Sequence, residues 1–305
     1  MKRVLITGVA GFLGRYAARH FLSLGWEVIG LDSLPPENAP LASLSRYVQI
    51  ALPDPRLEDL LQKQPPEVCA HFAGRASVAH SVSDPAPDYY AGPVLTFEML
   101  DSLRRLAPGC RFIFVSSAAV YGNPGRLPIR EDQPADPLSP YGYHKLQGEL
   151  LCQEFCRVYG LNTAILRPFS AYGPGLRRQV VWDICQKVLA KGRLFLQGTG
   201  NETRDFVHAA DIAQALAVIS QSAPMQGEAY NVANGRETSI GDLARLILGF
   251  VEIDSRVEFD GKVPQGVPLR WQADISRLNA LGWQPQVPFE EGLRSFVDWC
   301  RAELK

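Results

Sequence analysis

The sequence predicts an α/β protein with a doubly wound parallel sheet and a smaller, α-rich C-terminal substrate lobe. In the first half of the 305 residues, short apolar runs alternate with segments of helical periodicity. That alternation is typical of a parallel sheet covered by helices on both faces. Directly behind the first run, the glycines of TGVAGFLG stand where a strand would turn tightly into a helix.

Six segments of the first half have the composition of buried strands, and helical spacing of apolar residues separates them. The expected strands are residues 3–7, 27–31, 47–50, 67–72, 111–116 and 162–167. Near-continuous apolar runs such as FIFV fit strands that are buried on both faces of a sheet.

From about residue 170 the pattern changes, because Gly and Pro cluster in YGPG and QGTGNET and helices predominate. The expected helices are residues 180–191, 209–220, 239–250 and 289–303. We therefore expect a nucleotide-binding domain over residues 1–169, to which residues 204–235 return, and a lobe formed mainly by residues 170–305. The cleft between the two is the expected ligand site.

Composition narrows the class of function. An apolar fraction of 46%, a charged fraction of 21% and a formal net charge of −1 describe an ordinary globular protein with no attraction for nucleic acid or membranes. The six cysteines are scattered without a CxxC pair, so we expect free thiols and no metal site. No apolar run approaches the roughly 20 residues that span a bilayer. The expected location is the cytoplasm.

The glycine motif has the features of a Rossmann dinucleotide site. Gly8 permits the tight turn, Gly11 lets the backbone approach a pyrophosphate, and Gly14 allows close packing of helix on sheet. Asp32 ends the second expected strand, where a carboxylate binds the ribose hydroxyls of NAD and repels the 2′-phosphate of NADP. The expected cofactor is therefore NAD. The alternative is a plain strand-to-helix turn in which Asp32 only caps a loop.

A second constellation is SPYGYHK. Ser139 can cap a helix whose first residue is Pro140, which places Tyr141 and Lys145 on one helical face. An ammonium close to a phenol favours the phenolate, so we expect Lys145 to lower the pKa of Tyr141 and make it a base near neutrality. By itself such a pair is usually only helix surface.

The segment VSSAAVYG stands at the end of the fifth expected strand. Ligands of doubly wound sheets bind at the carboxyl ends of the strands. A serine hydroxyl at this place could hydrogen-bond both a substrate oxygen and Tyr141. In isolation, the two serines could equally do no more than close a strand.

Together, TGVAGFLG, HFAG, SSAAVYG, YGYHK and LRPFSAYGPG resemble the extended short-chain dehydrogenase/reductases, specifically the NAD-dependent nucleotide-sugar epimerase/dehydratase family. RDFVH, YNVANG and ADISR extend the resemblance through the C-terminal lobe. The resemblance implies that Ser117, rather than Ser116, acts with Tyr141 and Lys145 as the catalytic set.

Further roles follow from the resemblance alone. Cofactor contacts are implied at Gly8, Gly11, Phe12, Leu13, Gly14, Asp32, Ala73, Gly74, Tyr141, Lys145, Pro168 and Ser170. Arg204 would grip the diphosphate of a sugar nucleotide, with a surface salt bridge as the alternative, and Lys262 and Arg270 are weaker candidates for the same anion. The histidines of HFAG and RDFVH are expected to be structural.

The chain departs from the family pattern at several places. Sugar dehydratases carry an Asp-Glu pair after the catalytic Thr or Ser, and here those positions are Ala118 and Ala119. Dehydration and decarboxylation are therefore disfavoured. An Asn usual near the nicotinamide is replaced by Gly92-Pro93, and the Asn of the RPxN motif is Ser170.

The expected activity is that of an NAD-dependent nucleotide-sugar 4-epimerase that works through a transient 4-keto intermediate. The same three catalytic residues would also serve an NAD(P)H-dependent 4-ketoreductase of a 4-keto-6-deoxy nucleotide sugar. A non-catalytic NAD-binding sensor or scaffold is a third possibility. The expected partner is a nucleotide-diphosphate sugar, and the resemblance implies a homodimer in which helices near 85–106 and 140–159 form a four-helix bundle.

Overall fold

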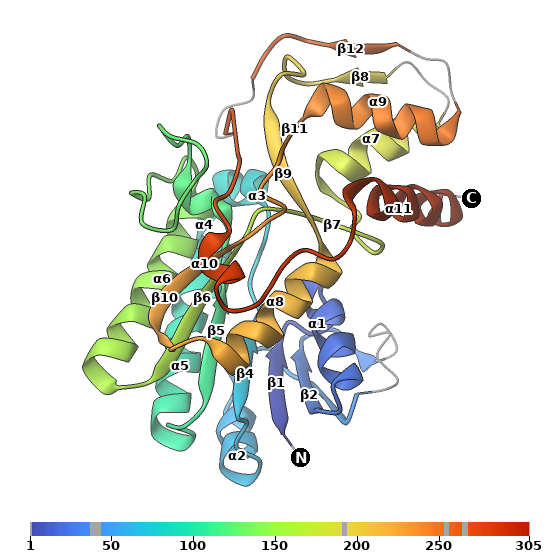
Figure 1. Ribbon diagram of the computed structural model, residues 1–305. Coiled ribbons are helices and arrows are strands. Elements are labelled where there is room, and N and C mark those ends of the chain that lie inside the picture. Colours follow the sequence, from blue (N-terminus) through green and yellow to red (C-terminus); the bar gives the residue numbers. More distant parts are fainter. Residues whose placement is uncertain (1, 37–43, 191–193, 253–255, 264–267, 305) are drawn as a thin grey trace.

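The computed structural model describes residues 2–36, 44–190, 194–252, 256–263 and 268–304. Its main body is a seven-stranded parallel sheet of order β3-β2-β1-β4-β5-β6-β10 (Figure 1). The strands are β1 Arg3–Thr7, β2 Glu27–Asp32, β3 Arg46–Gln49, β4 Val68–His71, β5 Arg111–Val115, β6 Asn162–Pro168 and β10 Gln226–Val232. This confirms the predicted fold class and the six predicted strands, whose ends move by one residue at most.

The seventh strand was not among the predicted ones. β10 comes from the second half of the chain and pairs with β6 from Gln226 opposite Thr163 to Val232 opposite Pro168. Its sequence, QGEAYNV, begins with polar residues and a glycine, so it lacks the continuous apolar run that marked the inner strands. An edge position explains this, since only one of its sides is paired.

Helices cover both faces of the sheet because its strands are apolar on both sides. Val4 and Ile6 point into one core with α1 (Phe12–Ser23) and α8 (Ala209–Ser222). Leu5 and Ile29 point into the other core, which is closed by three more helices. These are α2 Arg56–Lys63, α5 Leu95–Leu106 and α6 Pro140–Tyr159.

The smaller lobe lies at the carboxyl end of the sheet (Figure 1). Its core is formed by α7 (Gln179–Leu189), α9 (Ile240–Val251) and α11 (Phe289–Glu303), as predicted for three of the four helices. The fourth predicted helix, 209–220, is α8 on the main sheet. Strands complete the lobe: β7 Ser170–Tyr172, β8 Leu194–Leu196, β9 Thr203–His208, β11 Glu237–Ser239 and β12 Val257–Phe259.

The predicted helix 85–106 is interrupted. It consists of α4 (Pro85–Tyr89), a π-helical turn (Tyr90–Val94) and α5, and it follows the short α3 (Val78–Ser83). Pro93 lies inside the π-helical turn and has no N–H to donate, which is a physical reason for a break in the regular ladder. One residue before Pro93, the carbonyl of Gly92 accepts from the Thr96 hydroxyl at 2.9 Å.

Two negative findings hold for the described ranges. They contain no helix that is long and apolar enough to cross a membrane. They also contain no group of three or more His, Cys, Asp or Glu side chains that could hold a metal ion. All six cysteines are free thiols.

Candidate active site

The glycine loop joins β1 to α1 in a conformation that side chains would block. Gly8 has a φ of +69°, and a Cβ on Gly14 would lie 2.2 Å from the Gly8 carbonyl oxygen. The amide of Gly11, which begins the helix, donates to that same carbonyl at 3.0 Å. The next residues, Phe12 and Leu13, are the first two of α1. The loop therefore brings the helix N-terminus close to the end of β1, as a dinucleotide pyrophosphate requires.

Asp32 lies beside this loop at the end of β2. Its Oδ2 accepts from the amide of Ala10 at 2.9 Å, and its Oδ1 accepts from the amide of Leu34 at 3.2 Å. The carboxylate is thus fixed next to the glycine turn, where it fits the ribose hydroxyls of NAD.

The segment that follows β4 packs against the glycine loop, where a Cβ on Gly8 would lie 2.8 Å from the Ala73 nitrogen. The amide of Ala73 donates to the Thr7 hydroxyl at 3.2 Å, and the same hydroxyl contacts Nδ1 of His71 at 2.8 Å. Gly74 has a φ of +142°. Burial lowers the pKa of His71 to about 3, with a smaller contribution from the charge of Lys145. His71 is therefore neutral and has a packing role. Thr7, the first residue of TGVAGFLG, links the end of β1 to His71 and Ala73, a role that the sequence analysis did not assign to it.

Helix α6, which carries two residues of the predicted catalytic set, begins as predicted. The Ser139 hydroxyl accepts from the amide of Gly142 at 3.3 Å, with Pro140 at the first helical position. Tyr141 and Lys145 lie on the same face, with the Lys145 Nζ 6.0 Å from the centre of the Tyr141 ring. The ammonium donates to the Val115 carbonyl at 2.8 Å, so the end of β5 fixes its position.

Ser117 completes the set. It follows β5 and caps a short 3-10 turn, Ala118–Tyr121, where its Oγ accepts from the amide of Ala119 at 3.1 Å. It also interacts with the Tyr141 phenol. The three residues of the predicted catalytic set thus meet where β5 ends and α6 begins, although they come from separate motifs.

The predicted effect of Lys145 on Tyr141 needs correction. Burial raises the pKa of Tyr141, while the Ser117 side chain and the positive charge of Arg178 lower it and the charge of Asp88 raises it. Lys145 is not among these causes, and its ammonium donates to the Val115 carbonyl. Burial lowers the pKa of Lys145 itself to about 8, against the opposing charges of Asp88 and Glu149.

The other residues predicted to bind cofactor or substrate lie at different places in the structure. Pro168 ends β6 and Ser170 begins β7, so both lie at the carboxyl edge of the sheet. Arg204 on β9 donates to the carbonyls of Thr203 and Pro268 at 2.7 and 2.9 Å, and its guanidinium lies 5.4 Å from the ring of Trp271.

Burial lowers the pKa of Arg204 to about 10, which leaves it charged at neutral pH. Arg270 instead forms a two-bond ion pair with Glu237, at 2.6 and 3.0 Å, and its side chain is 63% exposed. Arg204 lies on β9, and Glu237, the ion-pair partner of Arg270, lies on the neighbouring strand β11. Lys262 follows β12, and no described contact joins it to either arginine.

A buried polar network holds the segment on either side of Ser117. The sequence analysis did not predict it. Arg167 on β6 makes two bonds to Glu149 on α6, at 2.5 and 2.9 Å. Glu149 also accepts from the Ser116 hydroxyl at 2.5 Å, and Arg167 donates to the Tyr121 hydroxyl at 2.7 Å. Ser116 and Tyr121 flank the loop that carries Ser117. The network therefore fixes both ends of that loop.

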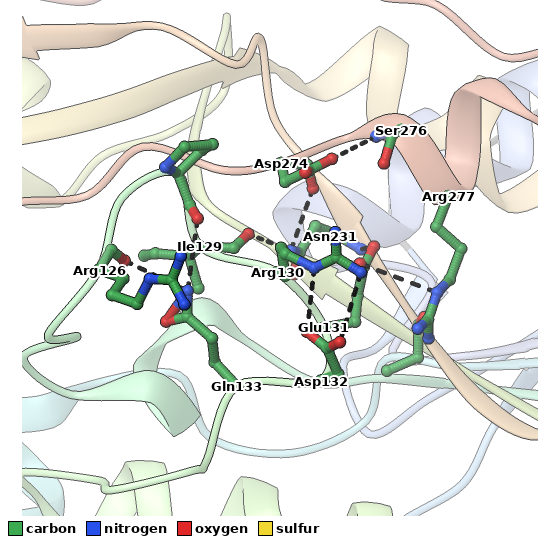
Figure 2. A network of polar contacts seen from close by, with 12 residues as sticks. Arg126, Ile129, Arg130, Glu131, Asp132, Gln133, Asn231, Asp274, Ser276 and Arg277 are labelled. Carbon is green, nitrogen blue, oxygen red and sulfur yellow. Dashed lines mark hydrogen bonds and ion pairs between the residues drawn. The ribbon is translucent and has the colours of Figure 1, made fainter.

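Figure 2 shows where the network reaches the outer loop 126–133. The Tyr121 hydroxyl donates to Oδ1 of Asn231 on β10 at 2.7 Å, and the backbone N–H of Asn231 donates to the Glu131 carboxylate at 2.9 Å. Arg277 of the short helix α10 (Ser276–Asn279) lies 3.8 Å from the same carboxylate. No single motif signals these contacts, because each partner comes from a different element.

A dinucleotide cradle built by glycines, together with a Ser, Tyr and Lys set at the strand ends, defines a nucleotide-dependent enzyme of the short-chain dehydrogenase/reductase class. The model of the NAD dependent epimerase/dehydratase family matches residues 4–233, and the chain belongs to that family. It is accordingly an enzyme of the extended class, and its cofactor is NAD.

Individual relatives agree along the whole chain. A UDP-glucose 4-epimerase of Mycolicibacterium smegmatis is 34% identical over 315 residues, with 98% of each chain covered. A protein of Methanocaldococcus jannaschii described as a putative UDP-glucose 4-epimerase is 31% identical over 304 residues, again with 98% of each chain covered. The solved structure of a Thermus thermophilus UDP-glucose 4-epimerase in complex with NAD is 29% identical, with a TM-score of 0.88, and 98% of this chain and 99% of that chain are covered.

Proposed function

We propose that this protein is an NAD-dependent nucleotide-sugar 4-epimerase. The observation that carries the proposal is the meeting of Ser117, Tyr141 and Lys145 beside the NAD groove, while alanines occupy the two positions after Ser117. A proton acceptor is present for a sugar hydroxyl, and the carboxylates that eliminate water are missing from the turn Ala118–Tyr121. The full-length similarity to 4-epimerases supports the same reaction.

The residues divide the work as follows. NAD, when bound, supplies the two-electron redox chemistry at C4 of the hexose. Tyr141 takes the proton of the C4 hydroxyl and later returns it, and Ser117 holds the C4 oxygen by a hydrogen bond. Lys145 is an ammonium below its pKa of about 8, and it binds the ribose of the cofactor. The Ser117 side chain and the charge of Arg178 favour the Tyr141 phenolate. The 4-keto sugar then turns over, so the hydroxyl is restored on the other face.

Arg204 is the proposed anchor for the diphosphate of the substrate. Its guanidinium is held by two carbonyls and by the ring of Trp271, which orders it before an anion binds. A prepared, charged donor of this kind suits phosphate oxygens. Arg270 has its guanidinium committed to Glu237, and we assign it and Lys262 only secondary contact with the same anion.

The helices α5 and α6 support the proposed homodimer. Phe97, Tyr143 and Leu150 on these helices are 44, 49 and 55% exposed. Apolar side chains exposed together on packed helices are typical of an interface. A charged substitution, Leu150→Glu, should convert a dimer to a monomer in light scattering, and a monomeric unaltered protein would contradict the proposal.

The test of the function is a direct assay of interconversion. The purified protein, supplied with UDP-glucose, should produce UDP-galactose without net consumption of NADH. UDP-N-acetylglucosamine and UDP-glucuronic acid extend the same assay to other sugars. Stoichiometric oxidation of NADH with a 4-keto-6-deoxy nucleotide sugar would identify a ketoreductase instead, and NAD binding without turnover of any sugar nucleotide would indicate a sensor.

A further inference from the structure

A buried Asp–His contact joins α4 to α6 and takes no part in the mechanism above. Asp88 of α4 is 3% exposed, and its Oδ2 lies 2.5 Å from Nδ1 of His144 on α6. The His144 side chain is 13% exposed. Transfer of a carboxylate into the protein interior is unfavourable unless a partner compensates it, so this contact fixes Asp88 where it lies.

Residues of α4 and of the π-helical turn pack against His144. The ring of Tyr89 meets the imidazole edge to face, with 5.4 Å between the ring centres. On the opposite chain segment, a Cβ on Gly92 would already be in contact with the His144 Cβ at 3.6 Å.

His144 directly precedes Lys145 and lies three residues after Tyr141, so the Asp88–His144 contact is made on the same stretch of α6 as the catalytic pair, Tyr141 and Lys145. Asp88 raises the pKa of each member of the catalytic pair. It favours the ammonium of Lys145 and disfavours the phenolate of Tyr141, as a nearby negative charge must.

Other charged groups also affect the pKa values of Tyr141 and Lys145. Arg178, whose guanidinium donates to the Ala76 carbonyl at 2.7 Å, favours the Tyr141 phenolate. Glu149 favours the Lys145 ammonium, but its carboxylate is bound by the guanidinium of Arg167. His71 is neutral. Asp88 differs from Glu149 because an imidazole, not a guanidinium, holds it.

We propose that Asp88 is a positioning residue of the active site: held in place by His144, its carboxylate maintains a negative charge beside the catalytic pair and so sets the pH range of turnover. The inference deepens the proposed epimerase function and rests on it. It assigns a role to Asp88 and His144, for which the sequence motifs suggested none.

The variant Asp88→Asn tests the role of the charge, because the amide has the same shape and keeps an acceptor for His144. Turnover needs Tyr141 deprotonated and Lys145 protonated, so loss of the charge lowers both apparent pKa values. Both limbs of the pH profile of kcat should move to lower pH, each by on the order of one unit or less, as for a unit charge at an effective dielectric constant near 20. A fold defect would lower kcat without moving both midpoints together.

The matched control is His144→Asn, whose side-chain nitrogen replaces imidazole Nδ1 while Asp88 keeps its charge. Its pH profile should not move to lower pH. Unmoved midpoints in Asp88→Asn, or an equal downward shift in both variants, would overturn the proposal.

A second readout is independent of turnover. The near-ultraviolet absorbance of tyrosinate can be titrated in the NAD-loaded protein, and the difference from Tyr141→Phe isolates the Tyr141 titration. That titration should move to lower pH in Asp88→Asn. If no sugar nucleotide is turned over, the proposed function fails, while this titration still decides whether Asp88 acts on Tyr141.

Discussion

The two sides of the active site are built by different means. On the cofactor side, backbone atoms determine the shape: a Cβ on Gly14 would meet the Gly8 carbonyl, and the Asp32 carboxylate is held by two amides. On the catalytic side, side chains hold the loop of Ser117 through buried charges such as Glu149 and Arg167. The cofactor side can therefore be predicted from a short sequence motif, whereas the catalytic side depends on residues that come together only in the folded protein.

The largest expected effect belongs to the catalytic side. Tyr141→Phe removes the proton acceptor and should lower kcat by roughly 10²- to 10⁴-fold, the usual contribution of a general base. The phenyl ring keeps its place, so NADH binding measured by fluorescence should change little. A variant that loses NADH binding together with turnover would contradict the separation of the two sides.

The buried network should matter more to stability than any exposed ion pair. Glu149→Gln leaves the Arg167 guanidinium buried without its counter-charge and should lower the free energy of unfolding by about 3–5 kcal/mol. The control is Arg270→Gln, since the Arg270–Glu237 pair is largely exposed and should contribute less than about 1 kcal/mol. Urea unfolding of both variants measures the difference, and equal losses would refute the role assigned to the network.

Gly14→Ala probes the backbone side. The new Cβ must displace the Gly8 carbonyl, so we expect a loss of about 1–3 kcal/mol in unfolding free energy and a weaker affinity for NAD in calorimetry. Gly109→Ala is the matched control, because a Cβ there has no atom within 4 Å. Normal NAD affinity in Gly14→Ala would show that the glycine loop does not need its close approach.

A smaller effect is expected from the pH dependence of stability at His71, the last residue of β4. His71 has a pKa of about 3 in the folded protein and about 6.5 when unfolded, so the unfolded state binds more protons between these values. The stability is complete above pH 6.5 and falls as the pH drops toward 3, by about 2 kcal/mol at pH 5. His71→Asn, which does not titrate, should flatten this part of the stability profile; an unchanged slope would contradict the neutral, buried state of His71.

The contrast between the two sides also explains what the sequence could predict. The six inner strands were recognisable because they are buried on both faces and therefore continuously apolar. Edge strand β10 was not recognisable, because its sequence mixes polar and apolar residues and begins with an exposed position. The predicted catalytic residues could be found because each belongs to a short motif that can be interpreted by itself: Ser117 at a strand end, and Tyr141 and Lys145 on one face of a helix. Their approach to one another follows from the order of strands in the sheet.

The pKa shifts and the polar contacts between residues far apart in the chain could not be predicted from the sequence. Helical spacing alone suggested that Lys145 would lower the pKa of Tyr141, but burial raises it and the Val115 carbonyl holds the ammonium. The contacts of Arg167 with Tyr121 and of Asp88 with His144 join residues that are 46 and 56 positions apart. No periodicity reports such pairs, because only tertiary packing brings them together.

The measurement that tests the epimerase account most directly follows the hydrogen at C4. The protein is incubated with UDP-glucose that carries deuterium at C4, and both sugar nucleotides are examined by NMR and mass spectrometry. If the C4 hydrogen is removed and returned within one active site, deuterium remains at C4 of both epimers and no cofactor is consumed. Loss of the label to water, or its transfer to added NAD, would contradict the account.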